Sequence, residues 1–163
     1  MNQVDSAAFA SSAAYLRPIG AVVAGFLADR FSAGKITAWS FAVLSIVFLS
    51  LSNILESSLL FNLAFFNLIV SYLAVFALRG VYFALVKESR IDLKVTGTAV
   101  GFISLVGYTP DIFFGPISAR ILDASPGAEG FENYFLMMMA IAFIGLLVAI
   151  GLNLINHKTK THD

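Results

Sequence analysis

Residues 134–152 read YFLMMMAIAFIGLLVAIGL, a run of nineteen residues without a charged side chain. An apolar run of eighteen or more residues can cross the hydrocarbon core of a bilayer as one helix. The rest of the chain has the same character, because 59% of its 163 residues are hydrophobic, 12% are charged and the mean hydropathy is +0.88. A soluble domain carries about twice that share of charged residues. The composition therefore predicts an integral membrane protein.

Outward from this run, four more apolar stretches are separated by short polar or charged breaks. They are continuous rather than alternating, which is typical of membrane helices and not of barrel strands. The sequence thus predicts an all-α, polytopic membrane helix bundle that forms a single membrane domain over residues 1–163. The five predicted transmembrane helices lie near 7–28, 36–54, 60–86, 96–122 and 131–155.

Several classes of function find no support in the composition. The net charge is zero, so we expect no nucleic-acid partner. Both histidines, His157 and His162, lie in the polar tail, so we expect no metal site. No histidine lies inside a span, where it could activate a serine as a nucleophile. An intramembrane enzyme would need a catalytic pair that the sequence does not show. We therefore predict no enzyme and no cofactor.

The basic residues predict the orientation of the bundle. Seven of them fall on one side of the predicted spans, whereas the opposite side holds only Arg120. Short loops rich in lysine and arginine remain in the cytoplasm. The loops 29–35 and 87–95 and the C-terminus should therefore face the cytoplasm, with the N-terminus outside a cytoplasmic (inner) membrane. The seven residues are Arg30, Lys35, Lys87, Arg90, Lys94, Lys158 and Lys160.

Residues 25–35, GFLADRFSAGK, resemble the loop signature of the major facilitator superfamily, G-x-x-x-D-R/K-x-G-R/K. In that family the signature lies between the second and third helices of each six-helix half. This chain departs from it by two extra residues before the second glycine and by Ile36 in place of a second basic residue. The matching residues are Gly25, Asp29, Arg30, Gly34 and Lys35.

The resemblance implies a partial major-facilitator half. The five predicted spans match helices eight to twelve of a twelve-helix carrier, and the run 96–117 is similar to the eleventh helix. The N-terminal half and the seventh helix of such a carrier would then be missing partners of this chain. The resemblance also implies that the 25–35 motif is a conformational latch. The alternative is a turn whose charges only keep it hydrated and set the topology.

Three charged residues fall deep within the predicted spans, away from their ends: Arg17, Arg79 and Asp111. Each costs at least ~2.5 kcal/mol at the centre of a membrane helix, so each needs a partner or a hydrated cavity. At about 1.5 Å per residue, the two arginines lie roughly 18 and 12 Å from the cytoplasmic end. In the family, the three helices that carry these charges line the central cavity.

The arginine fork suits a carboxylate, phosphate or sulfonate group. We therefore predict that Arg17 and Arg79 bind an anionic group of the substrate, with Asp111 as their counter-ion or as a protonatable gate. Tyr72, Tyr82 and Tyr108 would contribute phenol groups to the same site. Two other interpretations stay open: a permanent Arg17–Asp111 pair that helps the bundle to pack, and an Arg17 side chain that reaches the outer surface.

The predicted function is a part of a secondary active transporter that moves a small solute, here a small organic anion, by alternating access. Coupling to protons, as a symporter, is implied by the family alone. The alternative is a truncated membrane-embedded helix bundle that assembles with a partner and does not transport by itself.

Overall fold

A computed structural model describes residues 16–54, 61–88 and 92–160 of the chain. Within these ranges every regular element is an α-helix. The all-α class predicted from the continuous apolar runs is therefore confirmed. The helices are α2 (Leu16–Phe31), α3 (Ala33–Ile54), α4 (Phe61–Glu88), α5 (Leu93–Tyr108), α6 (Pro110–Ala124) and α7 (Ala128–Lys160).

By length and composition, three stretches of the described helices can cross a membrane: Ala33–Asn53, Lys94–Ala124 and Ala128–Ile155. Pro18–Ala28 and Phe66–Tyr82 are apolar as well, but shorter. The chain therefore forms a membrane-type helix bundle. The helices overlap the predicted ranges, except that residues 7–15 of the first range lie outside the described part. The five-span arrangement stays a prediction.

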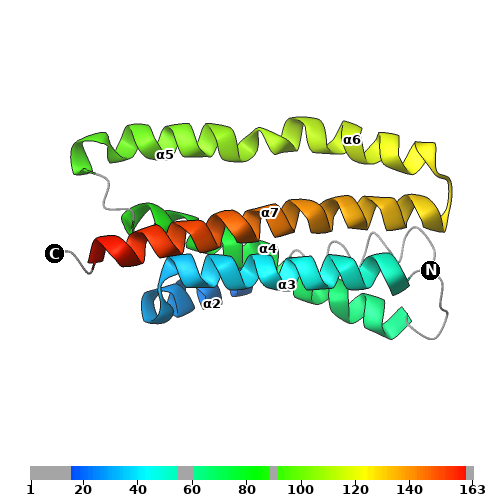
Figure 1. The fold of residues 1–163 in the computed structure, drawn as a ribbon, viewed down its shortest axis with the longest axis horizontal. Coiled ribbons are helices and arrows are strands. Elements are labelled where there is room, and N and C mark those ends of the chain that lie inside the picture. Colours follow the sequence, from blue (N-terminus) through cyan, green and yellow to red (C-terminus); the bar gives the residue numbers. More distant parts are fainter. Residues whose placement is uncertain (1–15, 55–60, 89–91, 161–163) are drawn as a thin grey trace.

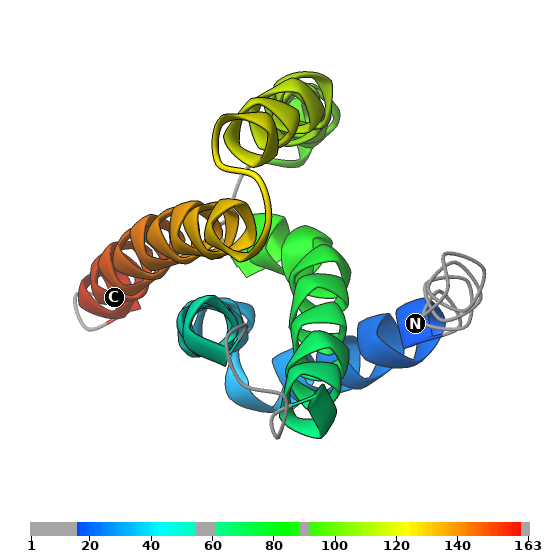
Figure 2. The ribbon, with the colours of Figure 1, turned by 90° about the vertical axis from the view of Figure 1, so that its right-hand side faces the viewer.

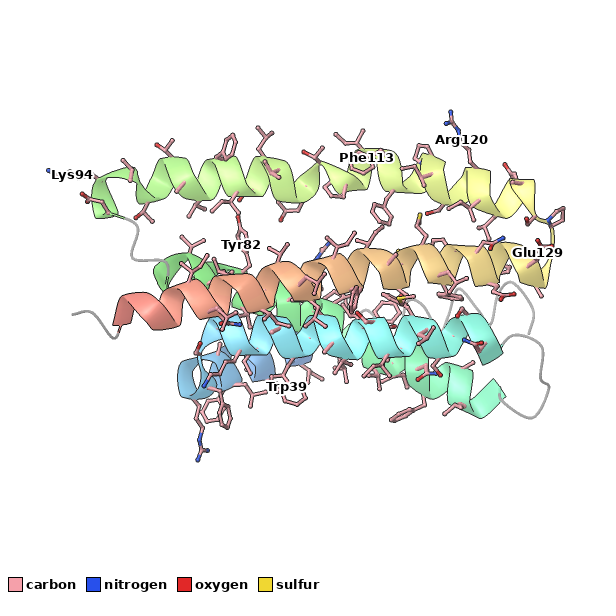
Figure 3. The ribbon with its side chains drawn as sticks, viewed as in Figure 1. Trp39, Tyr82, Lys94, Phe113, Arg120 and Glu129 are labelled. Carbon is pink, nitrogen blue, oxygen red and sulfur yellow. The ribbon has the colours of Figure 1, made fainter. Side chains whose placement is uncertain are left out.

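Successive helices run antiparallel along the length of the molecule, except that α6 continues in the direction of α5 (Figure 1). The α2–α3 turn, the end of α4, the start of α5 and the end of α7 gather at one end, while the end of α3, the start of α4 and the α6–α7 connection lie at the other. Lys94 lies at the first end and Glu129 at the second (Figure 3). The described basic residues Arg30, Lys35 and Lys94 thus lie at the same end of the bundle.

The core of the bundle lies around α3, which packs against both α4 and α7. Leu44, Val47 and Leu51 of α3 are buried there together with Ala74 of α4 and Ala142 of α7. A second, smaller cluster joins Ala28 of α2, Ala33 of α3 and Val81 of α4. Apart from Phe48 in the first cluster, the buried residues of both clusters are small or branched aliphatic side chains, and small side chains let helices approach closely.

The remaining pair, α5 and α6, stands apart from this core. Viewed end-on, the two helices form one pillar beside the other four (Figure 2). None of the apolar stretch from Lys94 to Ala124 is buried inside the described structure. Contacts between α6 and α7 and a side-chain hydrogen bond from α4 join this pillar to the bundle.

Candidate functional site

Arg79 lies in the second half of α4, within the apolar stretch Phe66–Tyr82. Two residues further on, Val81 is completely buried against α2 and α3, whereas the Arg79 side chain is exposed. No ion pair joins Arg79 to another residue that the structure describes. A charge in such a position needs a hydrated surrounding or a ligand of opposite charge.

Tyr82, one turn further along α4, connects that helix to α5. Its hydroxyl lies 2.9 Å from Oγ of Ser104, and either oxygen could donate the hydrogen bond. Figure 3 shows the Tyr82 side chain directed toward α5. Residues three apart share a helix face, so Arg79 lies on the face of α4 that carries Tyr82.

The Tyr82–Ser104 bond also sets the register between α4 and α5. The two helices run in opposite directions, so Arg79, three residues before Tyr82, lies at about the level of Gly107, three residues after Ser104. A Cβ atom at Gly107 would meet nothing within 4 Å. The next residue, Tyr108, is 66% exposed. The face of α5 at this level is therefore open.

We call Arg79, Tyr82, Ser104 and Tyr108 the α4–α5 polar patch. The Tyr82–Ser104 hydrogen bond joins the two helices there, and helix periodicity places Arg79 on the face of Tyr82 and Tyr108 on the face of Ser104. A guanidinium donates two parallel hydrogen bonds to a carboxylate or phosphate group, and hydroxyl groups can donate to the remaining oxygens. The chemistry of the patch thus suits an oxyanion.

Tyr72, the other predicted phenol, lies seven residues before Arg79, about 10 Å away along α4. Its ring is half-buried and packs against Phe76, with the ring centroids 5.9 Å apart. Tyr72 therefore lies on the same helix but apart from the polar patch. The side chains of Arg17 and Asp111 lie outside the described part of the structure, so their predicted roles stay predictions.

The predicted latch motif forms the α2–α3 turn, where a single residue, Ser32, separates the two helices. Ser32 has a positive φ of 87°, and its N–H donates to the carbonyl of Ala28 at 3.0 Å. Arg30 and Lys35 are exposed on either side, and the Arg30 guanidinium lies 5.9 Å from the centroid of the Phe31 ring. Asp29 belongs to α2, but the placement of its side chain is not described.

The two glycines of the motif differ in their surroundings. A Cβ atom at Gly25 would meet nothing within 4 Å, so this position does not require glycine for packing. Gly34 is buried, and its carbonyl accepts a hydrogen bond from Nδ2 of Asn153 at 2.8 Å. A Cβ atom at Gly34 would overlap the side-chain oxygen of Asn153.

Asn153 on α7 is a residue that the sequence reasoning missed. The available signal was an amide side chain within a long apolar run, which in a membrane helix often bonds to a neighbouring helix. Asn67 on α4 shows the same pattern, since its Nδ2 donates to Oγ of Ser50 on α3 at 3.0 Å. Among the described residues, no group of three His, Asp or Glu side chains could hold a metal ion.

Comparison with curated proteins finds relatives in bacterial membranes. The chain is 36% identical over 88 residues to the inner membrane protein YqcE of Escherichia coli K12, across 54% of this chain and 20% of that protein. It is 29% identical over 139 residues to the inner membrane protein YihN of the same organism, across 84% of this chain and 33% of that protein.

A third relative is an uncharacterised protein of Mycoplasma pneumoniae, 26% identical over 91 residues, across 51% of this chain and 41% of that protein. The chain thus spans between about a fifth and two fifths of the length of these relatives. No family model matches the chain, and no solved structure matches it. The relatives and the apolar helices together identify a protein of the cytoplasmic membrane.

Proposed function

We propose that this chain is part of a secondary active transporter of the major facilitator type and that its α4–α5 polar patch binds a small organic anion during transport. The observation that carries the proposal is the exposed Arg79 within an apolar stretch of α4. A membrane protein rarely keeps a charge at such a position unless it serves a substrate or ion path. Tyr82 and Ser104, which are hydrogen-bonded to each other one turn from Arg79, supply hydroxyl groups from the two helices.

Alternating access needs a site near the middle of the bilayer that opens to one side at a time. In this proposal α4 and the α5–α6 pillar form one wall of that site. The other wall comes from helices outside this chain, as the resemblance to a carrier half implies. The exposed surface of α5–α6 is consistent with a second wall, because none of its apolar stretch is buried in the described structure.

The polar patch can be tested by uptake of radiolabelled organic anions into membrane vesicles. The gene should be expressed in its full reading frame, and the panel should include monocarboxylates, dicarboxylates and organic phosphates. We expect Arg79→Gln to weaken uptake at least about tenfold, because a hydrogen bond to a charged group is lost. Arg79→Lys keeps the charge but loses the planar fork, so it should recover uptake only in part.

Arg120→Gln is the matched control. Arg120 is an exposed arginine on α6, toward the opposite end of the molecule from Lys94 (Figure 3). Its removal should leave anion uptake unchanged. Uptake that is equal in the wild type and in Arg79→Gln would contradict the anion site, and no uptake of any anion by the wild type would contradict the transport proposal.

A second candidate function is a helix bundle that assembles with a partner protein and does not transport alone. The exposed α5–α6 pillar favours it, because a partner could cover this surface as well as a carrier half could. Crosslinking from single cysteines on the pillar distinguishes the two, since the chain has no cysteine of its own. Crosslinks to helices encoded in the same reading frame support a carrier, whereas crosslinks to another gene product support the alternative.

A further inference from the structure

A second feature lies on the opposite face of the bundle from α5 and α6. There α2, α3 and α4 enclose a groove of about 460 Å³. It extends from Ile19 to Leu27 on α2, along residues 36–43 of α3 and along residues 70–77 of α4. At 1.5 Å per residue, the α2 wall is about 12 Å long. The walls are almost entirely aliphatic, so the groove suits a hydrocarbon chain and not a polar solute.

The rim of the groove carries Trp39, whose side chain is 71% exposed. Figure 3 shows Trp39 on the side of α3 that faces away from the α5–α6 pillar. Tryptophan is enriched where the acyl region of a bilayer meets the headgroups, because its ring is apolar and its N–H is polar. Trp39 thus indicates which part of the groove lies near the headgroups.

The end of the groove at Leu27 and Ile36, one turn of α3 from Trp39, is basic. Arg30 lies three residues after Leu27, so the two share a face of α2, and Lys35 lies four residues before Trp39, so these two share a face of α3. Both basic side chains are exposed. The side chain of Asp29, which lies between them in the sequence, is outside the described part. The aliphatic groove thus ends at two cationic groups, one on each side of the turn between α2 and α3.

We propose that this groove binds an anionic phospholipid of the surrounding bilayer, with an acyl chain between α2, α3 and α4 and the phosphate group at Arg30 and Lys35. The charge of the two basic residues selects an anionic headgroup over a zwitterionic one. Each lysine or arginine near an anionic membrane surface strengthens binding by about fivefold. This site does not depend on the α4–α5 polar patch or on transport.

The chain contains one tryptophan, Trp39, so its fluorescence reports directly on the groove. The purified full chain should be reconstituted in vesicles of phosphatidylcholine and phosphatidylglycerol at a fixed ratio. Brominated acyl chains, which quench tryptophan on contact, are placed on only one of the two lipids at a time. We expect stronger quenching when phosphatidylglycerol carries the bromine, at equal mole fraction of bromine. Equal quenching by the two lipids would overturn the proposal.

The basic residues are tested with Arg30→Gln/Lys35→Gln in the same vesicles. We expect the ratio of quenching by brominated phosphatidylglycerol to quenching by brominated phosphatidylcholine to fall to about one, since both headgroup contacts are lost. Lys94→Gln is the matched control, because Lys94 is an exposed lysine at the same end of the molecule but on α5. The control should keep the preference. A preference that persists in the double variant, or an equal loss in Lys94→Gln, would overturn the headgroup assignment.

Discussion

Ser32 holds a backbone conformation that residues with a side chain rarely adopt. Its positive φ of 87° lets α2 end and α3 begin within a single residue, and its carbonyl accepts the N–H of Ile36 at 3.2 Å. In this left-handed region the Cβ atom crowds the following carbonyl oxygen, which glycine avoids. The strained residue of the predicted latch motif is therefore Ser32, which lies between the two glycines of the motif.

Replacing Ser32 by glycine should stabilise the protein. The left-handed conformation costs a residue with a side chain about 1 kcal/mol, so we expect Ser32→Gly to raise the free energy of unfolding by about that amount. Unfolding in mixed detergent micelles, followed by circular dichroism, measures it. Ser45→Gly, inside α3, is the control and should destabilise by up to about 1 kcal/mol. A Ser32→Gly variant that is less stable than the wild type would contradict the prediction.

Gly34 and Asn153 form the second unusual contact at the scale of single residues. The bond from Asn153 Nδ2 to the Gly34 carbonyl joins the start of α3 to α7. Such bonds between membrane helices contribute about 0.6 kcal/mol on average and up to about 2 kcal/mol. The absence of a side chain at Gly34 is what lets the amide group approach.

The two residues should therefore be coupled in a double-mutant cycle. We expect Gly34→Ala to destabilise the wild type by about 1 kcal/mol, because the new methyl group displaces the Asn153 side chain and breaks the bond. In the Asn153→Ala background the same substitution meets no obstacle and should be close to neutral. Unfolding free energies of the four proteins give the coupling. Additive effects would show that the contact does not exist in the membrane.

At the scale of helices, α3 and α7 form the largest interface of the described structure. The two helices can approach closely there because Gly145 has no side chain. A Cβ atom at Gly145 would come within 2.5 Å of the Phe41 ring, whereas a Cβ atom at Gly151, further along α7, would meet nothing within 4 Å. The two glycines thus provide a matched pair on one helix.

We expect Gly145→Ala to be less stable than Gly151→Ala by about 1–3 kcal/mol. Both substitutions gain the same helix propensity, but only the first forces the Phe41 ring to move within a packed interface. Unfolding free energies of the two variants, compared with the wild type, test this. Similar values for the two variants would mean that α3 and α7 are further apart than the structure has them.

The division of one apolar run into α5 and α6 is also decided at this scale. Pro110 lacks an N–H and begins α6, and the N–H of Thr109 donates to the carbonyls of Leu105 at 3.2 Å and Val106 at 3.3 Å. The Thr109 hydroxyl donates to the Leu105 carbonyl as well, at 2.7 Å. The carbonyl groups that a proline leaves unpaired are thus satisfied within the helix. The two helices consequently continue in nearly the same direction (Figure 1).

At the scale of the whole molecule, the basic turns lie at one end and the acidic residues Glu129 and Glu132 near the other. The positive-inside rule then predicts that the end with Arg30, Lys35 and Lys94 faces the cytoplasm. The structure supports the grouping of these residues. Which side of the membrane they face stays a prediction.

Single cysteines can determine the orientation, since the chain has none of its own. We expect Ser125→Cys, in the α6–α7 turn, to react with a membrane-impermeant maleimide added to intact cells. Thr96→Cys, near the start of α5, should react only after the membrane is permeabilised. Labelling is read as a mass shift of the purified protein. The reverse pattern would invert the topology, and labelling of both from outside would contradict a span through α5 and α6.

The helical class and the membrane location followed from the sequence, because run length, hydropathy and proline positions are local properties that act on each segment separately. The turn at Ser32 lies within the predicted loop 29–35, whereas the break at Thr109 divides the predicted span 96–122 into α5 and α6. Part of the candidate site could also be predicted from the sequence, since a lone arginine in an apolar helix is visible there.

Which residues meet was decided only by the tertiary structure. Tyr82 and Ser104 are 22 residues apart and Asn153 and Gly34 are 119 apart, and each pair forms a hydrogen bond between two helices. Periodicity assigns a residue to a face of its own helix but does not say which helix covers that face. In an apolar surrounding polar groups must find partners on neighbouring helices, so packing of the whole bundle selects the pairs.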